Sequence, residues 1–122
     1  MDQVAKMSLY YDFYGGLLTP KQQRVFSLYY MDNLSLAEIA EEEGTTRQAV
    51  HDLLQRTEKL LERWEKELAL VARYLKEKRA VGEIKESLEE LGRCLSGEDE
   101  AYRRYLAVRK KVMDLEAHLE GE

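Results

Sequence analysis

Residues 34–61 read LSLAEIAEEEGTTRQAVHDLLQRTEKLL, and this stretch predicts two helices joined by a tight turn. Ser35 followed three residues later by Glu38 is a capping box, which marks the start of a helix. The predicted apolar face of this short helix consists of Leu36, Ala37, Ile39 and Ala40. Gly44 follows its last turn, where a residue without a Cβ adopts the left-handed backbone that reverses the chain. The pattern is that of a helix-turn-helix.

The second helix of this motif begins after two threonines, Thr45 and Thr46, which are both candidate N-caps. Its predicted inner face is Ala49, Val50, Leu53, Leu54, Thr57 and Leu60. In a helix-turn-helix, the outer side of this second helix reads a nucleic-acid groove. The candidate residues for contact with a nucleic acid or another partner are therefore Thr46, Arg47, Gln48, His51, Gln55 and Arg56.

Two more helices are expected before the motif. The first should cover Val4 to Leu18, and the second should start at the capping box of Thr19 and Gln22 and run to about Tyr30. The predicted buried residues of the two helices are Val4, Met7, Tyr11, Tyr14, Leu18, Val25, Phe26, Leu28 and Tyr29. Their tyrosines could also stack on unpaired bases, but core packing is the favoured interpretation.

Beyond residue 60, apolar residues recur at alternating intervals of four and three, which is heptad spacing. The three stripes are Leu61, Trp64, Leu68, Val71 and Leu75; Val81, Ile84, Leu88, Leu91 and Leu95; and Tyr105, Val108, Val112, Leu115 and Leu119. We expect them to pack as an antiparallel bundle or across a homodimer interface. Gly82 is predicted to weaken or bend the junction of the first two stripes, and residues 96–99 to form a turn. The expected architecture is all-α, with a helix-turn-helix domain over 1–75 and a helical extension over 76–122.

The charge balance bears on the choice of partner. The 122-residue chain has a formal net charge of −5, whereas proteins that bind duplex DNA usually depend on an excess of lysine and arginine. Glu41, Glu42 and Glu43, together with Asp52, should also repel phosphate near the contact helix. The sequence therefore favours a basic protein, or RNA already neutralised by protein, over bare duplex DNA.

Several other classes of protein are disfavoured. The single Cys94 cannot form an internal disulfide, and no signal segment or apolar run of about 20 residues is present, so a cytoplasmic protein without membrane insertion is expected. Only His51 and His118 could act as near-neutral bases, and neither belongs to a nucleophile or metal motif. We expect no enzyme, no metal and no cofactor.

The stretch FYGGLLTPKQQRVFSLYYMDNLSLAEIAEEEGTTRQAVHDLLQRTEKLLE resembles the YlxM family of small bacterial helix-turn-helix proteins. The shared motifs are LLT-KQ, the YY pair, SLAEIAEE, the turn before RQAV, and RTEKLLE, which together cover roughly residues 9 to 75. The chain departs from the family pattern at Thr46, where serine is common, and at His51, where an aromatic residue is common. The motif also resembles region 4 of sigma factors.

This resemblance implies an accessory or regulatory component of the signal recognition particle, contacting its RNA, its GTPase Ffh, or both. The family's genes tend to lie beside those of Ffh or its receptor FtsY. One alternative is a DNA-binding transcriptional regulator, in which Thr46, Arg47, Gln48 and His51 read a major groove and Arg56 contacts phosphate. Another is a structural dimer whose turn motif has become a docking surface for proteins. The resemblance transfers no catalytic residues.

Overall fold

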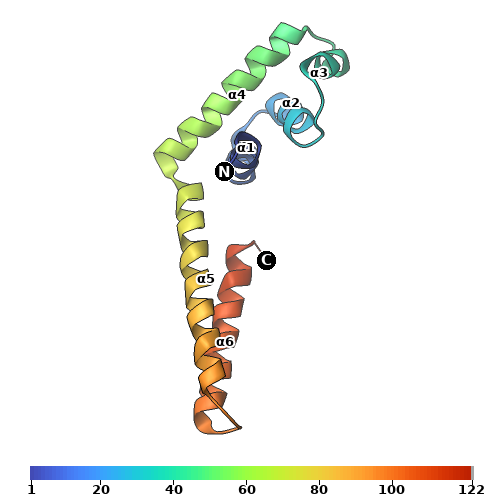
Figure 1. Cartoon of the computed structure of the whole chain (residues 1–122). Helices are drawn as coiled ribbons and strands as arrows, with labels where there is room; N and C mark the ends of the chain where they lie inside the picture. The colour runs from blue at the N-terminus through green and yellow to red at the C-terminus, as the bar shows by residue number, and fades with distance from the viewer. Residues whose placement is uncertain (122) are drawn as a thin grey trace. The chain divides into compact units, whose positions relative to one another are not determined.

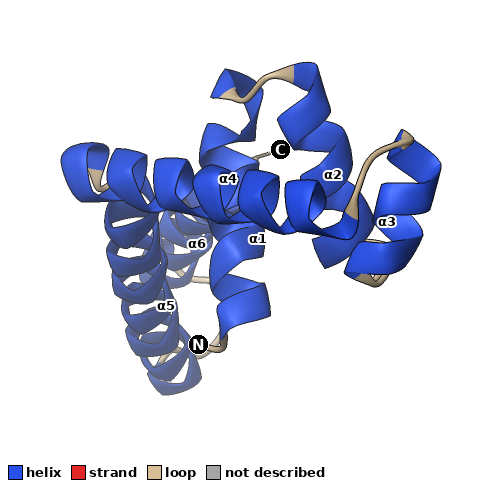
Figure 2. Ribbon diagram, turned by 90° about the horizontal axis from the view of Figure 1, so that it is seen from above, coloured by secondary structure: helices blue, strands red, loops and turns tan. Residues whose placement is uncertain are grey.

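A computed structural model describes residues 1–121, and every secondary-structure element in it is helical (Figures 1 and 2). The elements are α1 (Gln3–Tyr14), a 3-10 turn (Gly15–Leu17), α2 (Pro20–Tyr30), α3 (Leu36–Glu43), α4 (Arg47–Leu68), α5 (Leu70–Cys94) and α6 (Glu100–Leu119). The all-α prediction is therefore confirmed. The chain divides into Met1–Val71, here called the helix-turn-helix unit, and Ala72–Glu122, the hairpin unit. Within the described residues, no helix is both long and apolar enough to cross a membrane.

The helix starts predicted from capping signals are confirmed. Thr19 Oγ1 accepts a hydrogen bond from the Gln22 backbone N–H at 3.2 Å, and the Gln22 side chain accepts one from the Thr19 N–H at 2.9 Å. Ser35 and Glu38 make the same reciprocal pair, at 3.1 and 3.0 Å. Each pair satisfies backbone donors that the first turn of a helix would leave unpaired. The hydrogen bonds from Ser35 lower the pKa of the Glu38 carboxyl group.

The turn between α3 and α4 depends on Gly44, which adopts the left-handed conformation with φ of 65°. The next residue, Thr45, donates its N–H to the Ala40 carbonyl at 3.0 Å, which closes the end of α3. Of the two candidate caps, Thr46 is the N-cap of α4, and its side chain accepts from the Ala49 N–H at 3.1 Å. Both arms of the predicted motif are therefore present with the predicted turn.

The first helix is shorter than predicted, because α1 ends at Tyr14 and a 3-10 turn carries the chain to Leu17. Two consecutive glycines at 15 and 16 account for this, since glycine is a poor residue for a helix interior. Met7 and Tyr14 are buried as predicted. Val4, which was also predicted to be buried, is 54% exposed.

The core of the helix-turn-helix is formed where α4 packs against α2 and α3, and α4 also contacts α1 (Figure 2). Its buried residues are Val25, Ile39, Ala40, Val50 and Leu54, with Leu28, Leu34, Leu36 and Leu53 packed around them. Three residues predicted for buried faces are instead exposed, namely Tyr29, Ala37 and Ala49. The actual apolar stripes are therefore narrower than the predicted ones.

Aromatic side chains join α1 and α2 to each other and to α4. The Phe26 ring stacks on Tyr11 at a centroid distance of 4.7 Å and on Tyr30 at 4.5 Å. The Tyr30 hydroxyl donates to Glu58 of α4 at 2.6 Å. Burial, together with the hydrogen bond to the Glu58 carboxylate, raises the pKa of the Tyr30 phenol. The core interpretation of the tyrosines accounts for Tyr11, Tyr30 and the buried Tyr14.

The helical break after α4 falls at Ala69, not at Gly82. Ala69 has a φ of 54°, a left-handed conformation that is unusual for a residue with a Cβ. Gly82 lies inside the continuous helix α5, so no helix ends at this residue. No glycine or proline marks the true position, which is why the sequence pattern did not reveal it.

Two side chains satisfy the backbone at the start of α5. The Tyr14 hydroxyl donates to Glu65 Oε1 at 2.6 Å and accepts from the Leu70 N–H at 3.0 Å. Glu65 Oε1 also accepts from the Val71 N–H at 3.0 Å. Burial and the Glu65 carboxylate raise the pKa of the Tyr14 phenol. This network supplies partners for two of the N–H groups that the first turn of a helix cannot pair internally.

The hairpin unit pairs α5 and α6 in antiparallel orientation, one of the two arrangements expected from the heptads (Figure 1). Near the open end, the Tyr74 hydroxyl donates to Glu120 at 3.0 Å. Farther along, Lys85 Nζ donates to Glu116 at 3.3 Å. At the closed end, a Cβ on Gly92 would collide with the ring of Tyr105, so this side chain of α6 lies directly against the backbone of α5.

Candidate nucleic-acid interface

The outer face of α4 holds the six residues predicted to make contacts. Thr46, Arg47, Gln48, Gln55 and Arg56 are exposed, and the His51 side chain is 46% exposed. Thr46 caps the helix and Arg47 begins it, so both lie at the end that a helix-turn-helix presents to a ligand. The structure places all six within the first ten residues of α4 and its cap.

Asp52 lies among these donors and engages two of them. Gln48 Nε2 donates to Asp52 Oδ1 at 3.0 Å, one helical turn away. His51 Nδ1 lies 3.5 Å from the same oxygen, the upper limit of a hydrogen bond. Any acceptor that binds Gln48 through this amide group must therefore compete with the Asp52 carboxylate.

A shallow surface hollow brings Gln55 and Arg56 together with Asp52 and Lys59. Lys59 was missed as a contact residue by sequence reasoning. The signal was present, because Gln48, Asp52, Gln55 and Lys59 follow the spacing of one face of an α-helix. Lys59 adds a second cation beside Arg56 on this face.

The two arginines of the candidate interface do not share one line along the helix. Arg47 and Arg56 are nine residues apart, which corresponds to about half a turn around an α-helix. Neither has an ion-pair partner among the described residues. They therefore flank the face on which Gln48, Asp52 and Gln55 lie.

The acidic run at the end of α3 is only partly exposed to solvent. Arg24 Nη2 donates to Glu43 Oε1 at 3.2 Å, and the Glu43 side chain is only 14% exposed. Glu42 and Glu43 line a hollow together with residues of α2. Since Arg24 neutralises Glu43, the repulsion of phosphate expected from this run is smaller than its three charges indicate, and Asp52 is the acid placed among the contact residues.

The residues described by the structure include no group of three or more histidine, cysteine, aspartate or glutamate side chains arranged to hold a metal ion. What the face of α4 offers is a set of hydrogen-bond donors: guanidinium, amide and ammonium groups. Such groups suit the base edges and phosphates of nucleic acids, and also carboxylates of proteins.

Comparisons with known proteins agree with this geometry. Residues 1–96 match the family model described as “Putative helix-turn-helix protein, YlxM / p13 like”. A UPF0122 protein of Halalkalibacterium halodurans is 44% identical over 89 residues, which cover 73% of this chain and 82% of the relative. One from Geobacillus sp. (strain WCH70) is 44% identical over 86 residues, covering 70% and 78%, respectively. The match reaches 21 residues beyond the motifs recognised in the sequence, into α5. The chain thus belongs to the YlxM / p13-like family of helix-turn-helix proteins.

Proposed function

We propose that this protein is an accessory or regulatory component of the signal recognition particle, and that it binds the particle's RNA, its GTPase Ffh, or both, through the outer face of α4. Membership of a helix-turn-helix family supports nucleic-acid binding by this face. The link to the particle rests on the YlxM resemblance. The fold and the family suggest binding and not catalysis.

The position of Asp52 among the hydrogen-bond donors is the main reason to favour a ribonucleoprotein or a basic protein over bare duplex DNA. Its carboxylate already accepts from Gln48, and its charge offsets one of the nearby cations. Residues 1–71 also contain 12 acidic and eight basic side chains. Because most non-specific affinity for duplex DNA comes from cations facing phosphates, this face is better suited to a structured ribonucleoprotein, or to a basic protein surface, than to bare duplex DNA.

The proposal is tested by titrating the full chain against the particle's RNA, Ffh, and their complex at low salt. We expect binding to at least one of these, and weaker binding by the Arg47→Ala/Arg56→Ala variant. A matched control is Arg79→Ala/Arg93→Ala, which removes the same charge from exposed positions of α5. Absence of binding to all three ligands, together with identical behaviour of the two double variants, would contradict the proposal.

A sequence-specific DNA-binding regulator is the second candidate. It is favoured by the first turn of α4, where a capped helix start presents Arg47 and Gln48 to solvent, as in helix-turn-helix proteins that read the major groove. Selection of bound sequences from random duplex DNA separates the two candidates. Enrichment of a palindrome with half-sites one helical turn apart, or a multiple of it, would support the regulator, and lack of any enrichment would remove it.

A further inference from the structure

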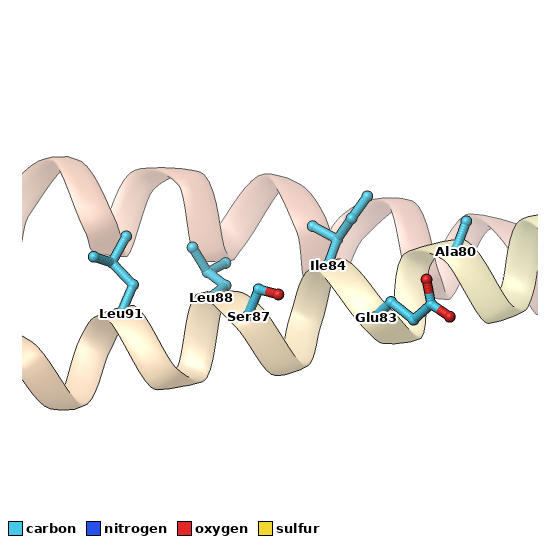
Figure 3. A pocket seen from close by; sticks show the side chains of 6 residues that line it. All are labelled: Ala80, Glu83, Ile84, Ser87, Leu88 and Leu91. Carbon is cyan, nitrogen blue, oxygen red and sulfur yellow. The ribbon is translucent and has the colours of Figure 1, made fainter.

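In the hairpin unit, part of the apolar stripe of α5 is exposed to solvent. Ile84 is 53% exposed and Leu91 is 50% exposed, although both occupy heptad positions that should be buried. Figure 3 shows their side chains in a row with Leu88 and Ala80, above the ribbon of α5. This row borders a surface hollow of about 470 Å³.

The open surface continues onto α6. A second hollow is lined by Leu88, Leu91 and Leu95 from α5 and by Ala101, Tyr105 and Val108 from α6. Val108 is 47% exposed, and Leu115, one heptad later, is also 47% exposed. Two paired helices can cover only one side of each apolar stripe, so one face of the hairpin remains uncovered. We call it the open face.

Charges of opposite sign border the open face. Glu83 and Glu90, seven residues apart, lie on the outer edge of the α5 stripe, whereas Arg104 and Lys111, also seven apart, lie on the outer edge of the α6 stripe. All four side chains are exposed. Among the described residues, Arg104 pairs with Glu100 at 3.0 Å, and no ion pair is made by the other three.

We propose that the open face binds a second copy of this chain, with α5 of each copy packed on α6 of the other to form an antiparallel four-helix bundle. A two-fold axis parallel to the helices produces this arrangement, and each interface is then repeated twice. The acidic edge of one copy meets the basic edge of the other. A homodimer is also what the heptad spacing led us to expect.

Rotation about a two-fold axis parallel to the helices leaves each residue at the same height along the bundle. The residues that lie level with each other within one hairpin therefore also lie level between the two copies. Lys85 lies beside Glu116, and Gly92 lies beside Tyr105. Counting from these contacts places residue 111 level with residues 86–90. Lys111 of one copy would therefore lie close to Glu90 of the other, with Arg104 one to two helical turns from the same glutamate.

The same charges disfavour the other face-to-face dimer. A two-fold axis perpendicular to the helices would pack α5 on α5 and α6 on α6. The side of α5 that carries Glu83 and Glu90 would then face the same side of the other copy, and the side of α6 that carries Arg104 and Lys111 would do likewise. Like charges in such proximity are destabilising, which leaves the mixed pairing of α5 with α6 as the favoured one.

The test is sedimentation equilibrium of the full chain and its charge variants. We expect the wild type to dimerise, and the dissociation constant to rise about tenfold or more in Glu83→Lys/Glu90→Lys, since the Glu90–Lys111 pair is reversed at each of two interfaces. The reciprocal variant, Arg104→Glu/Lys111→Glu, should be weakened similarly. An equimolar mixture of the two variants should recover a heterodimer, because each supplies the charge that the other lacks.

The matched control is Glu86→Lys/Glu89→Lys, which makes the same change in charge on the side of α5 away from the open face. It should dimerise like the wild type, and circular dichroism should show equal helicity in all variants. A wild type that stays monomeric at about 100 μM overturns the proposal. So does a Glu83→Lys/Glu90→Lys variant that dimerises as tightly as the wild type, the result expected if α5 packs on α5 or if another face forms the dimer.

Discussion

The two units of this chain differ in how completely they bury their own apolar residues. In the helix-turn-helix unit, Met7, Phe26, Ile39 and Leu61 have no exposed surface. In the hairpin unit, the most buried apolar residues are Val81 and Leu88, at 6% and 8% exposure. The difference follows from the number of neighbours: α4 is packed against three helices, whereas α5 and α6 have mainly each other within their unit. Apolar periodicity therefore predicts a buried face only where enough elements exist to cover it.

The largest expected effect comes from truncating a side chain in each unit. Phe26→Ala should lower the free energy of unfolding by about 3–5 kcal/mol, because it removes a fully buried ring stacked on two others. Ile84→Ala should lower it by less than about 1 kcal/mol at a concentration where the chain is monomeric. Urea denaturation of both variants gives the comparison. Equal losses would show that the two units are packed to the same degree.

The next effect concerns the hydrogen bonds at the start of α5. Tyr14→Phe leaves the Leu70 N–H without its acceptor and removes one donor to Glu65, so we expect a loss of about 1–3 kcal/mol. Tyr10→Phe is the matched control, since the Tyr10 hydroxyl makes no hydrogen bond among the described residues. Tyr10→Phe should change the free energy of unfolding by no more than about 0.5 kcal/mol. Denaturation curves showing the same stability for both variants would remove the role assigned to this network.

Base should destabilise the helix-turn-helix unit through its buried phenols. The pKa values of Tyr14 and Tyr30 are raised above the ordinary 10.0, by burial first and by the neighbouring glutamates second. The unfolded chain thus loses these protons near pH 10 while the folded chain keeps them, so their stabilising effect is complete below pH 10 and declines above it. The slope for each phenol increases through pH 10 toward a maximum of about 1.4 kcal/mol per pH unit. Denaturation between about pH 9 and pH 11 should give a smaller slope for Tyr30→Phe, and an unchanged slope would refute this assignment.

The smallest effects distinguish two glycines of α5. Gly82→Ala should stabilise the helix by about 0.5–1 kcal/mol, because a Cβ there meets no atom within 4 Å and alanine favours the helix. Gly92→Ala should stabilise the hairpin less than Gly82→Ala does, because its Cβ would force the Tyr105 ring to move. Thermal unfolding followed by circular dichroism measures both. Equal gains in stability from the two changes would show that the Tyr105 ring does not lie against Gly92.

Local signals predicted the elements that depend on neighbouring residues. The capping pairs Thr19 with Gln22 and Ser35 with Glu38, and the left-handed Gly44, are each contained within a few residues, and all were found where the sequence placed them. The start of α4 was predicted at Thr45 or Thr46, and it lies at Thr46. The positions of the contact residues on one exposed helix followed from these boundaries.

Features that depend on distant residues could not be predicted in this way. The Tyr14 hydroxyl meets Glu65, 51 residues away, and the Tyr30 hydroxyl meets Glu58, 28 residues away. The left-handed Ala69 directly precedes Leu70, whose N–H binds Tyr14, and has no marker in the sequence. The exposure of Val4 similarly depends on which helices pack against α1.

Asp52 has a consequence for the ionic-strength dependence of binding. The slope of log affinity against log salt reports the counterions released, about 0.9 for each phosphate neutralised on duplex DNA. Arg47, Arg56 and Lys59 are the full cations of the candidate interface, and Asp52 lies among them. A complex with bare duplex DNA through this face should therefore show a slope of only about two, and a much steeper slope for any nucleic acid would mean that cations elsewhere in the chain also bind it.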